Sequence, residues 1–196
     1  VNNVRQDNTP YFLTANHCSL DQMGNQSSTA DFEQWKFYFK FQRPGCATGT
    51  ALAGDQVIGC TKRGDSHDNG GDSGSDFLLL EALDATIPDS YDPYWNGWDA
   101  TGTGSSSGVG IHHPAGSEKK ISTYSSSLQS STWGSVPNTH WRVVWVATAN
   151  GHGVTEGGSS GSPLFNSAHH IIGTLTGGGS FCSSPTSPDY YGKVSY

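Results

Sequence analysis

The stretch GVTEGGSSGSPLF (153–165) places Ser160 among three glycines and closes the turn with Ser-Pro ahead of an apolar pair. Glycine allows a positive φ and lets the backbone approach a ligand closely, so this composition suits a turn built around a reactive side chain. The same composition also suits an ordinary surface connection between two strands. The rest of the chain has to decide between these two interpretations.

Length and composition favour a chain of short strands. A chain of 196 residues is long enough for one domain or for two small packed lobes. Hydrophobic residues make up 33% of the chain and aromatic residues 11%, so aromatic rings must supply much of the core. Glycine and serine divide the sequence into short pieces, which favours strands and turns over long helices.

Charge and hydropathy exclude two classes of partner. The formal net charge is −7, which argues against binding to nucleic acids or to anionic membrane surfaces. No apolar run approaches the roughly 20 residues needed to span a bilayer. The first residues, VNNVRQDNTP, do not have the pattern of a signal peptide. We therefore expect a soluble chain with neither a nucleic-acid nor a membrane partner.

Apolar runs fall into two groups, separated by a loop-like stretch at 84–107. The first group is predicted as four strands: PYFLTAN (10–16), QWKFYFKF (34–41), QVIGC (56–60) and SDFLLLEAL (75–83). The second group is predicted as six strands: GVGIHH (108–113), KKISTY (119–124), HWRVVWVATA (140–149), SPLF (162–165), HHIIGTLT (169–176) and YYGKVSY (190–196). No segment predicts a helix. The fold class is therefore all-β, in two lobes.

Three polar residues at the edges of apolar strands suit nucleophilic catalysis. The hydroxyl of Ser160 is a weak nucleophile, and it needs a base and a group that orients the base. His17, at the end of the strand in YFLTANHC, is the candidate base. Asp76 opens an apolar strand, where a carboxylate withdrawn from water needs a hydrogen-bond partner such as a histidine N–H. The backbone N–H groups of Gly158 and Ser160 are the candidate oxyanion hole.

Each of these residues also has a structural interpretation. His17 can be a solvated turn residue, and Asp76 can be an aspartate that begins a strand, because Asp favours turns. The chain has eight histidines, and His112 and His113 in GIHHPAG are rivals for the role of base. The three sites together favour catalysis more strongly than any one of them alone.

The motifs TANHC, SDFLLLEAL and GGSSGSPLF resemble the three catalytic motifs of chymotrypsin-like serine proteases. The sequence is most similar to the bacterial secreted lysyl endopeptidases. That resemblance extends over nearly the whole chain, in VNN…YFLTANHC, the Gly-Trp-Asp at 97–99, IHHP (111–114), EKKIS (118–122), TEGGSSGSPLF, IIGTLTGG (171–178) and PDYYGKV (188–194).

The resemblance implies two six-stranded antiparallel β-barrels, with lobes at 1–100 and 101–196. It implies amide hydrolysis through an acyl-enzyme, without a metal or cofactor. His17 would act as general base and then acid, Asp76 would orient the imidazole, and Ser160 would attack the substrate. It further implies a secreted, extracellular monomer that acts on polypeptides.

Specificity depends on where an acid lies in the substrate pocket. In trypsin the pocket acid precedes the nucleophile by six residues, and Val154 occupies that position here. The resemblance places the pocket acid at Asp189, which would pair with a lysine before the scissile bond. Glu156 is a second acid nearby, interpreted as rim or structural, and acceptance of arginine stays open. The further substrate-binding candidates are Thr155, Trp133, Thr176 and Gly177.

Two positions depart from the pattern of relatives. Lysyl endopeptidases of the best-known type stack a histidine on a tryptophan beside the pocket. Here the tryptophan is Trp133, and we assign the histidine position to Thr176. Residue 159 is serine where trypsin-type enzymes have aspartate, so an ion pair with a new N-terminus is unavailable. Any activation is therefore expected to come from removal of a pro-segment.

The cysteines and the strand count suggest a missing segment. The first group has four predicted strands where the fold implies six. The resemblance pairs Cys18, Cys46 and Cys182 with cysteines nearer the N-terminus that this chain does not have, and leaves a Cys46–Cys60 bond open. We expect an N-terminal segment of about two strands to be absent. We also expect the stop at KVSY to omit a final helix.

Other functions stay as alternatives. DSHDNGGDSGSD (65–76) is a loose match to a calcium-binding loop, but it lacks the closing Glu and would use Asp76 as a ligand. We therefore expect no metal site. A catalytically silent relative that binds peptides or glycans through an aromatic β surface is one alternative. A serine protease of different specificity is another, and it depends on Asp189.

Overall fold

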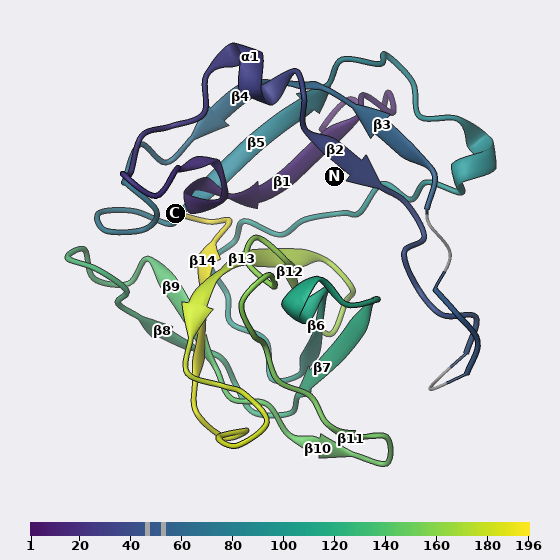
Figure 1. Ribbon diagram of the computed structural model, residues 1–196. Helices are drawn as coiled ribbons and strands as arrows, with labels where there is room; N and C mark the ends of the chain where they lie inside the picture. Colours follow the sequence, from purple (N-terminus) through teal and green to yellow (C-terminus); the bar gives the residue numbers. More distant parts are fainter. Residues whose placement is uncertain (46–47, 52–53) are drawn as a thin grey trace.

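The computed structural model describes residues 1–45, 48–51 and 54–196. Strands dominate it and form two groups, which lie one above the other in the view of Figure 1. The upper group comes from the N-terminal half of the chain and the lower group from the C-terminal half. No helix in the described part of the chain is long and apolar enough to cross a bilayer. The predicted all-β class is therefore confirmed.

Among the described residues, five strands form the N-terminal group. An antiparallel sheet of order β1-β5-β4 contains β1 (Tyr11–Ala15), β4 (Cys60–Asp65) and β5 (Phe77–Ala82). A second, two-stranded sheet pairs β2 (Lys36–Tyr38) with β3 (Gln56–Ile58). The prediction of four strands missed β4, because its sequence CTKRGD is mostly polar. Gly59, with φ +84°, separates β3 from β4.

Seven strands form the main sheet of the C-terminal group, in the order β7-β6-β12-β13-β14-β9-β8. Their bounds are β6 (Gly108–His112), β7 (Lys120–Tyr124), β8 (Gln129–Ser131), β9 (His140–Val143), β12 (Pro163–Phe165), β13 (Ile171–Gly178) and β14 (Asp189–Lys193). A separate hairpin joins β10 (Ala147–Thr148) to β11 (Gly151–His152). The single strand predicted at 140–149 is therefore wrong beyond Val143. The polar strand β8 was missed.

One short helix corrects the expectation that the chain has none. Helix α1 (Thr29–Phe32) is a single turn closed by a capping box between Ser28 and Asp31. The Ser28 N–H donates to Asp31 Oδ2 at 2.8 Å, and the Asp31 N–H donates to Ser28 Oγ at 3.3 Å. A single turn is too short to give a helical hydrophobic period. Three 3₁₀ turns accompany it: η1 (Asn16–Ser19), η2 (Asp89–Tyr91) and η3 (Pro114–Gly116).

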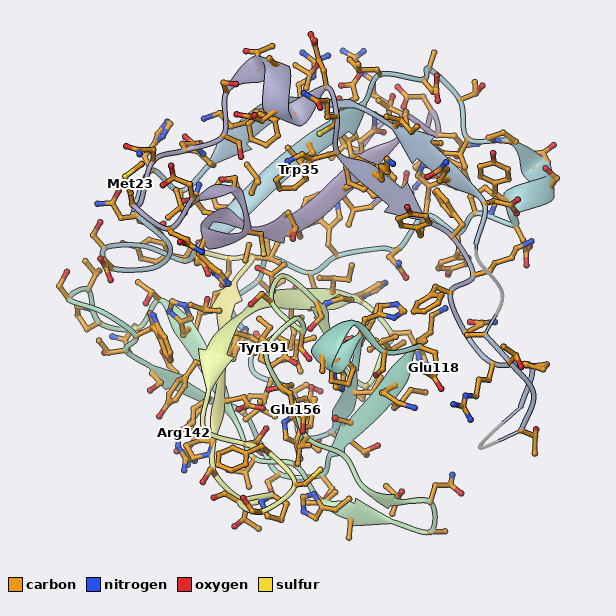
Figure 2. The ribbon with its side chains drawn as sticks, in the orientation of Figure 1. Met23, Trp35, Glu118, Arg142, Glu156 and Tyr191 are labelled. Carbon is orange, nitrogen blue, oxygen red and sulfur yellow. The ribbon has the colours of Figure 1, made fainter. Side chains whose placement is uncertain are left out.

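Aromatic rings supply much of the core, as the composition predicts. In the C-terminal group, Trp145 packs edge-on against Tyr191, with ring centroids 6.1 Å apart. Tyr191 is fully buried and lies in the middle of this group (Figure 2). In the N-terminal group, Phe12 stacks on Phe37 at 4.1 Å beside the buried side chain of Leu80. Each group thus has its own apolar core.

Glycines let the two groups meet without intervening side chains. A Cβ at Gly161 would overlap Thr14 Oγ1 at the end of β1. A Cβ at Gly192, on β14, would overlap the carbonyl oxygen of Ser75. These contacts bring the turn that contains Ser160 to the end of β1, and β14 to the residue before Asp76.

The three described cysteines form no disulfide with one another. These are Cys18, Cys60 and Cys182, and Cys60 is buried against the carbonyl oxygen of Phe32. Cys46 lies outside the described residues, so the Cys46–Cys60 bond stays a prediction.

Truncating a core leucine tests the packing of β5. Leu80 is fully buried, whereas Leu83, just beyond the same strand, is 53% exposed. We expect Leu80→Ala to lower the free energy of unfolding by about 2–5 kcal/mol, because it leaves a cavity. Leu83→Ala should change it by only about 0.5 kcal/mol. Urea denaturation measures both, and equal losses would contradict the described packing.

Candidate active site

His17 and Asp76 form a close pair at the end of β1. His17 lies in η1, directly after β1, and Asp76 directly precedes β5, the neighbour of β1 in the sheet. His17 Nδ1 lies 2.7 Å from Asp76 Oδ2, and the His17 backbone N–H donates to Asp76 Oδ1 at 2.9 Å. Asp76 is fully buried, whereas 30% of the His17 side chain is exposed. The His17 backbone N–H and ring nitrogen thus both lie within hydrogen-bond distance of the buried carboxylate.

The carboxylate of Asp68 fixes the backbone of Asp76 through a hydrogen bond. Asp76 has φ +55°, in the left-handed region that few residues other than glycine adopt. Its backbone N–H donates to Asp68 Oδ2 at 2.8 Å, and the Gly71 N–H donates to Asp68 Oδ1 at 3.0 Å. A Cβ at Gly74 would crowd the Asp68 carboxylate. The loop before β5 therefore wraps around Asp68 and fixes the conformation of Asp76.

Ser160 lies in a tight turn that leaves two N–H groups free. The Ser159 N–H donates to Glu156 O at 3.0 Å, and the Gly161 N–H donates to Leu175 O at 2.8 Å. Within the described part of the chain, the N–H groups of Gly158 and Ser160 have no hydrogen-bond acceptor. Gly158 has φ +93°, a conformation that glycine adopts without strain. The turn thus has two unpaired donors, which suit an oxyanion.

The hydroxyl of Ser160 and the ring of His17 form no hydrogen bond with each other in the described structure. Both belong to segments that meet where Gly161 contacts Thr14. Catalytic hydrogen bonds are often long without a substrate, so this geometry does not remove either residue as a candidate.

Asp189 is hydrogen-bonded to two residues that line a pocket beside Ser160, Thr155 and Ser180. The pocket is lined by residues of the 155–160 and 175–181 segments, including Thr155, Leu175 and Ser180. Asp189 is fully buried. Its Oδ2 accepts from Trp145 Nε1 at 2.6 Å, from Thr155 Oγ1 at 2.7 Å and from Ser180 Oγ at 2.5 Å. Its Oδ1 accepts from the Ser180 N–H at 3.1 Å. Within the described residues no lysine, arginine or histidine forms an ion pair with it.

Of the remaining predicted pocket residues, Gly177 lines this pocket, and Trp133 and Thr176 have contacts elsewhere. Trp133 packs against Tyr190, with centroids 5.5 Å apart, and a Cβ at Gly177 would lie 3.1 Å from Trp133 Cη2. Thr176 turns its Oγ1 to His140 Nε2 at 2.9 Å. A side chain at position 177 would therefore contact Trp133. The assignment of the histidine position to Thr176 stays a prediction.

The rival histidines have other partners. His112 is buried between the hydroxyls of Ser159 and Ser122, each 2.9 Å from a ring nitrogen. His113 Nδ1 lies 3.0 Å from the carbonyl oxygen of Ser117. Neither has the carboxylate partner that His17 has.

The acidic side chains of the stretch that resembles a calcium-binding loop (65–76) bond to other groups of the protein. Asp65 pairs with Lys62 at 2.6 Å and with the His67 ring, while Asp68 binds backbone N–H groups. In the described ranges, no group of three His, Cys, Asp or Glu side chains is arranged to hold a metal ion. Sequence reasoning missed the roles of Asp68 and His112. The only local signal was the glycines around Asp68.

Comparison with known proteins identifies the family. The sequence model described as "Lysyl endopeptidase, C-terminal domain" matches residues 1–192. The chain belongs to the lysyl endopeptidase family. A lysyl endopeptidase of Pseudomonas aeruginosa is 34% identical over 203 residues, a match that covers the whole of this chain. The chain spans 40% of the length of that relative.

Solved structures share the fold at low sequence identity. A thermostable serine protease from an extremophilic microorganism matches with a TM-score of 0.66 and 15% identity, covering 95% of this chain and 80% of its own. A Glu endopeptidase matches with a TM-score of 0.53 and 13% identity, covering 95% of this chain and 77% of its own. The predicted chymotrypsin-like fold is confirmed.

Removing the acceptor behind Asp76 should destabilise the site. We expect Asp68→Ala to lower the free energy of unfolding by about 1–3 kcal/mol, because buried N–H groups lose their partner. Asp68→Asn, which keeps one carbonyl acceptor, should lose less. Asp72→Asn changes an exposed acid in the same loop and serves as the matched control. Urea denaturation of the three variants measures the effect, and equal stabilities of Asp68→Ala and Asp72→Asn would refute it.

Two buried histidines should make the fold sensitive to acid. Burial lowers the pKa of His112 to about 4, and that of His140 to about 4. In the unfolded chain both have a pKa of about 6.5, so the unfolded state binds protons more readily between these values. The free energy of unfolding should fall by about 3 kcal/mol for each histidine as the pH drops from about 6.5 to 4.

Urea denaturation between pH 7 and pH 4 measures this slope. His140→Gln should reduce the pH dependence of the free energy of unfolding by the contribution of one histidine. His169→Asn, which replaces an exposed histidine, should leave it unchanged. A slope that is the same in His140→Gln as in the unaltered chain would contradict the assignment.

Proposed function

We propose that this chain is a serine endopeptidase that cleaves peptide bonds after lysine. The observation that carries the proposal is the pair formed by His17 and the fully buried Asp76, with Nδ1 and Oδ2 2.7 Å apart. A carboxylate that accepts a hydrogen bond from Nδ1–H fixes the tautomer in which Nε2 is free to accept a proton. The turn that contains Ser160 meets the same end of β1, through Gly161 and Thr14.

In the proposed acylation step, Ser160 Oγ attacks the carbonyl carbon of the scissile bond, and His17 Nε2 takes the hydroxyl proton. The imidazolium that forms is stabilised by Asp76. The carbonyl oxygen becomes an oxyanion, which would accept hydrogen bonds from the free N–H groups of Gly158 and Ser160. When the carbon–nitrogen bond breaks, His17 returns the proton to the leaving amine.

In deacylation, a water molecule attacks the carbonyl carbon of the ester. His17 Nε2 takes a proton from the water, and the same two N–H groups again hold the oxyanion. As the ester bond breaks, the proton passes to Ser160 Oγ. The products are a carboxylic acid and the restored enzyme, so no cofactor enters the balance.

The proposed preference for lysine rests on Asp189. Neutral hydroxyl and N–H groups surround its carboxylate, so its negative charge is not neutralised by another residue of the described chain. A lysine side chain combines a long apolar stem with a compact ammonium group. Leu175 and the backbone of Gly177 and Gly178 suit the stem. An acidic side chain would meet a like charge.

The remaining predictions agree with this function. No described strand lies between Ala82 and Gly108, which supports the proposed division into lobes at 1–100 and 101–196. Action on polypeptides as a secreted monomer stays part of the proposal.

Mapping the cuts in an unfolded protein substrate tests the function. Mass spectrometry should find cuts after lysine with the unaltered chain and none with Ser160→Ala. Asp189→Asn keeps an acceptor for Trp145 but removes the charge. We expect it to lower kcat/KM for lysine substrates by about 100-fold or more, because the ammonium loses its partner. Asp84→Asn, an exposed acid remote from the pocket, is the matched control and should cleave normally.

Each outcome separates one part of the proposal from another. Cuts after other residues that still require Ser160 would leave the protease intact and refute the pocket assignment. A folded chain that neither cuts nor reacts with a fluorophosphonate probe would refute the protease. Thermal unfolding confirms that each variant is folded.

A further inference from the structure

A buried histidine that the proposed mechanism does not use contacts the turn that presents the oxyanion donors. His112 is the last residue of β6 and only 2% exposed. Its Nδ1 lies 2.9 Å from the hydroxyl of Ser159, the residue between Gly158 and Ser160. Ser159 is itself 1% exposed. The hydroxyl of Ser159 also lies 3.3 Å from the N–H of Glu156, which donates to it and closes the turn.

The hydrogen bonds define which nitrogen of His112 carries the proton. The Ser122 hydroxyl donates to the carbonyl oxygen of Val154 at 3.2 Å, so its oxygen accepts from His112 Nε2–H at 2.9 Å. His112 Nδ1 then has no proton and accepts from the Ser159 hydroxyl. Every group in this chain of hydrogen bonds has a partner when His112 is neutral.

The backbone around His112 supports the same turn. The Ala115 N–H donates to Gly157 O at 2.7 Å, directly after β6. A Cβ at Gly158 would lie 3.3 Å from the Ala115 nitrogen. The turn thus rests on β6 and η3, and within the described residues the imidazole of His112 is the only side chain that hydrogen-bonds to Ser159.

We propose that His112, as a neutral imidazole bonded to Ser159, is a positioning residue that keeps the N–H groups of Gly158 and Ser160 directed at the oxyanion. The inference rests on the proposed function, because it assigns the support of that same site. Residue 159, directly before Ser160, is an uncharged serine. Its hydrogen bond to neutral His112 replaces the ion pair that an aspartate at this position forms with the new N-terminus in trypsin-type enzymes.

The surroundings of His112 favour its neutral form. The pKa of His112 is lowered to about 4, chiefly by burial and also by the neighbouring His113, while Asp189 on β14 acts in the opposite direction. Lys120 pairs with His112 in the β6–β7 register, and Glu156 lies at the exposed end of the turn. If Nδ1 gained a proton, the Ser159 oxygen would have to accept from both His112 and Glu156, and its own proton would lose its acceptor.

Replacing His112 should therefore slow turnover without weakening substrate binding. The oxyanion exists only in the transition state and intermediate, so misdirected donors lower kcat and leave KM unchanged. We expect His112→Phe and Ser159→Ala each to lower kcat about 10- to 100-fold on a lysine amide substrate. The double variant should lose no more than the worse single variant, because both changes break the same bond. His113→Phe, the same substitution one residue along, is the matched control.

The assay separates this inference from the proposed function. If the unaltered chain cleaves in a Ser160-dependent manner while both single variants keep kcat, the positioning role is refuted and the protease stands. Multiplied losses in the double variant would also refute it. Ser159→Ala removes one oxygen only, so it supplies the answer if His112→Phe does not fold.

Nuclear magnetic resonance decides the inference if the chain does not cleave. The ¹⁵N signals of His112 should show a proton on Nε2 and none on Nδ1 down to about pH 4. The amide signals of Gly158 and Ser160 should shift in Ser159→Ala and His112→Phe but not in His113→Phe. A proton on Nδ1 at neutral pH, or amide signals that do not move, would overturn the assignment.

Discussion

A carboxylate that has no contact with water must be surrounded by hydrogen-bond donors, and much of this structure follows from that need at Asp76. The His17 ring and the His17 backbone N–H provide the donors, which places the histidine at the end of β1, opposite the start of β5. The left-handed backbone of Asp76 in turn needs a restraint, and Asp68 provides it. One buried charge thus determines the course of the loop before β5 and the orientation of the proposed base.

The second buried carboxylate, Asp189, is satisfied in a different way. Its donors are an indole N–H, two hydroxyls and one backbone N–H, none of which carries a charge. The arrangement keeps a negative charge available while it removes most of the cost of burial. Asp76 is paired with His17, whose ring can carry a charge, and Asp189 has no such partner in the described chain. This difference fits the proposed tasks of the two acids, one in proton transfer and one in recognition.

The sequence was most informative where function and local pattern coincide. His17, Asp76 and Ser160 each adjoin an apolar strand, so their positions could be predicted together with the strands. Polar strands such as β4 and β8 have no such pattern, and they were missed. The support from Asp68 and His112 depends on bonds between residues that are distant in the chain, such as the 47 positions between His112 and Ser159. The periodicity of apolar residues in the sequence does not indicate such a contact. On a strand, a shift of one residue reverses the direction of a side chain, so Thr176 bonds to His140 while position 177 adjoins Trp133.

The segment 154–160 connects the floor of the pocket to the turn that contains Ser160. Thr155 is bonded to Asp189, and four residues later Ser159 is bonded to His112. A substitution near Asp189 that moves Thr155 would also move Ser159, because the two residues are only four positions apart in the chain. New specificity in this scaffold would therefore have to evolve by paired changes on both sides of that segment. In the proposed enzyme, an exchange of Asp189 alone would also affect the chemical step.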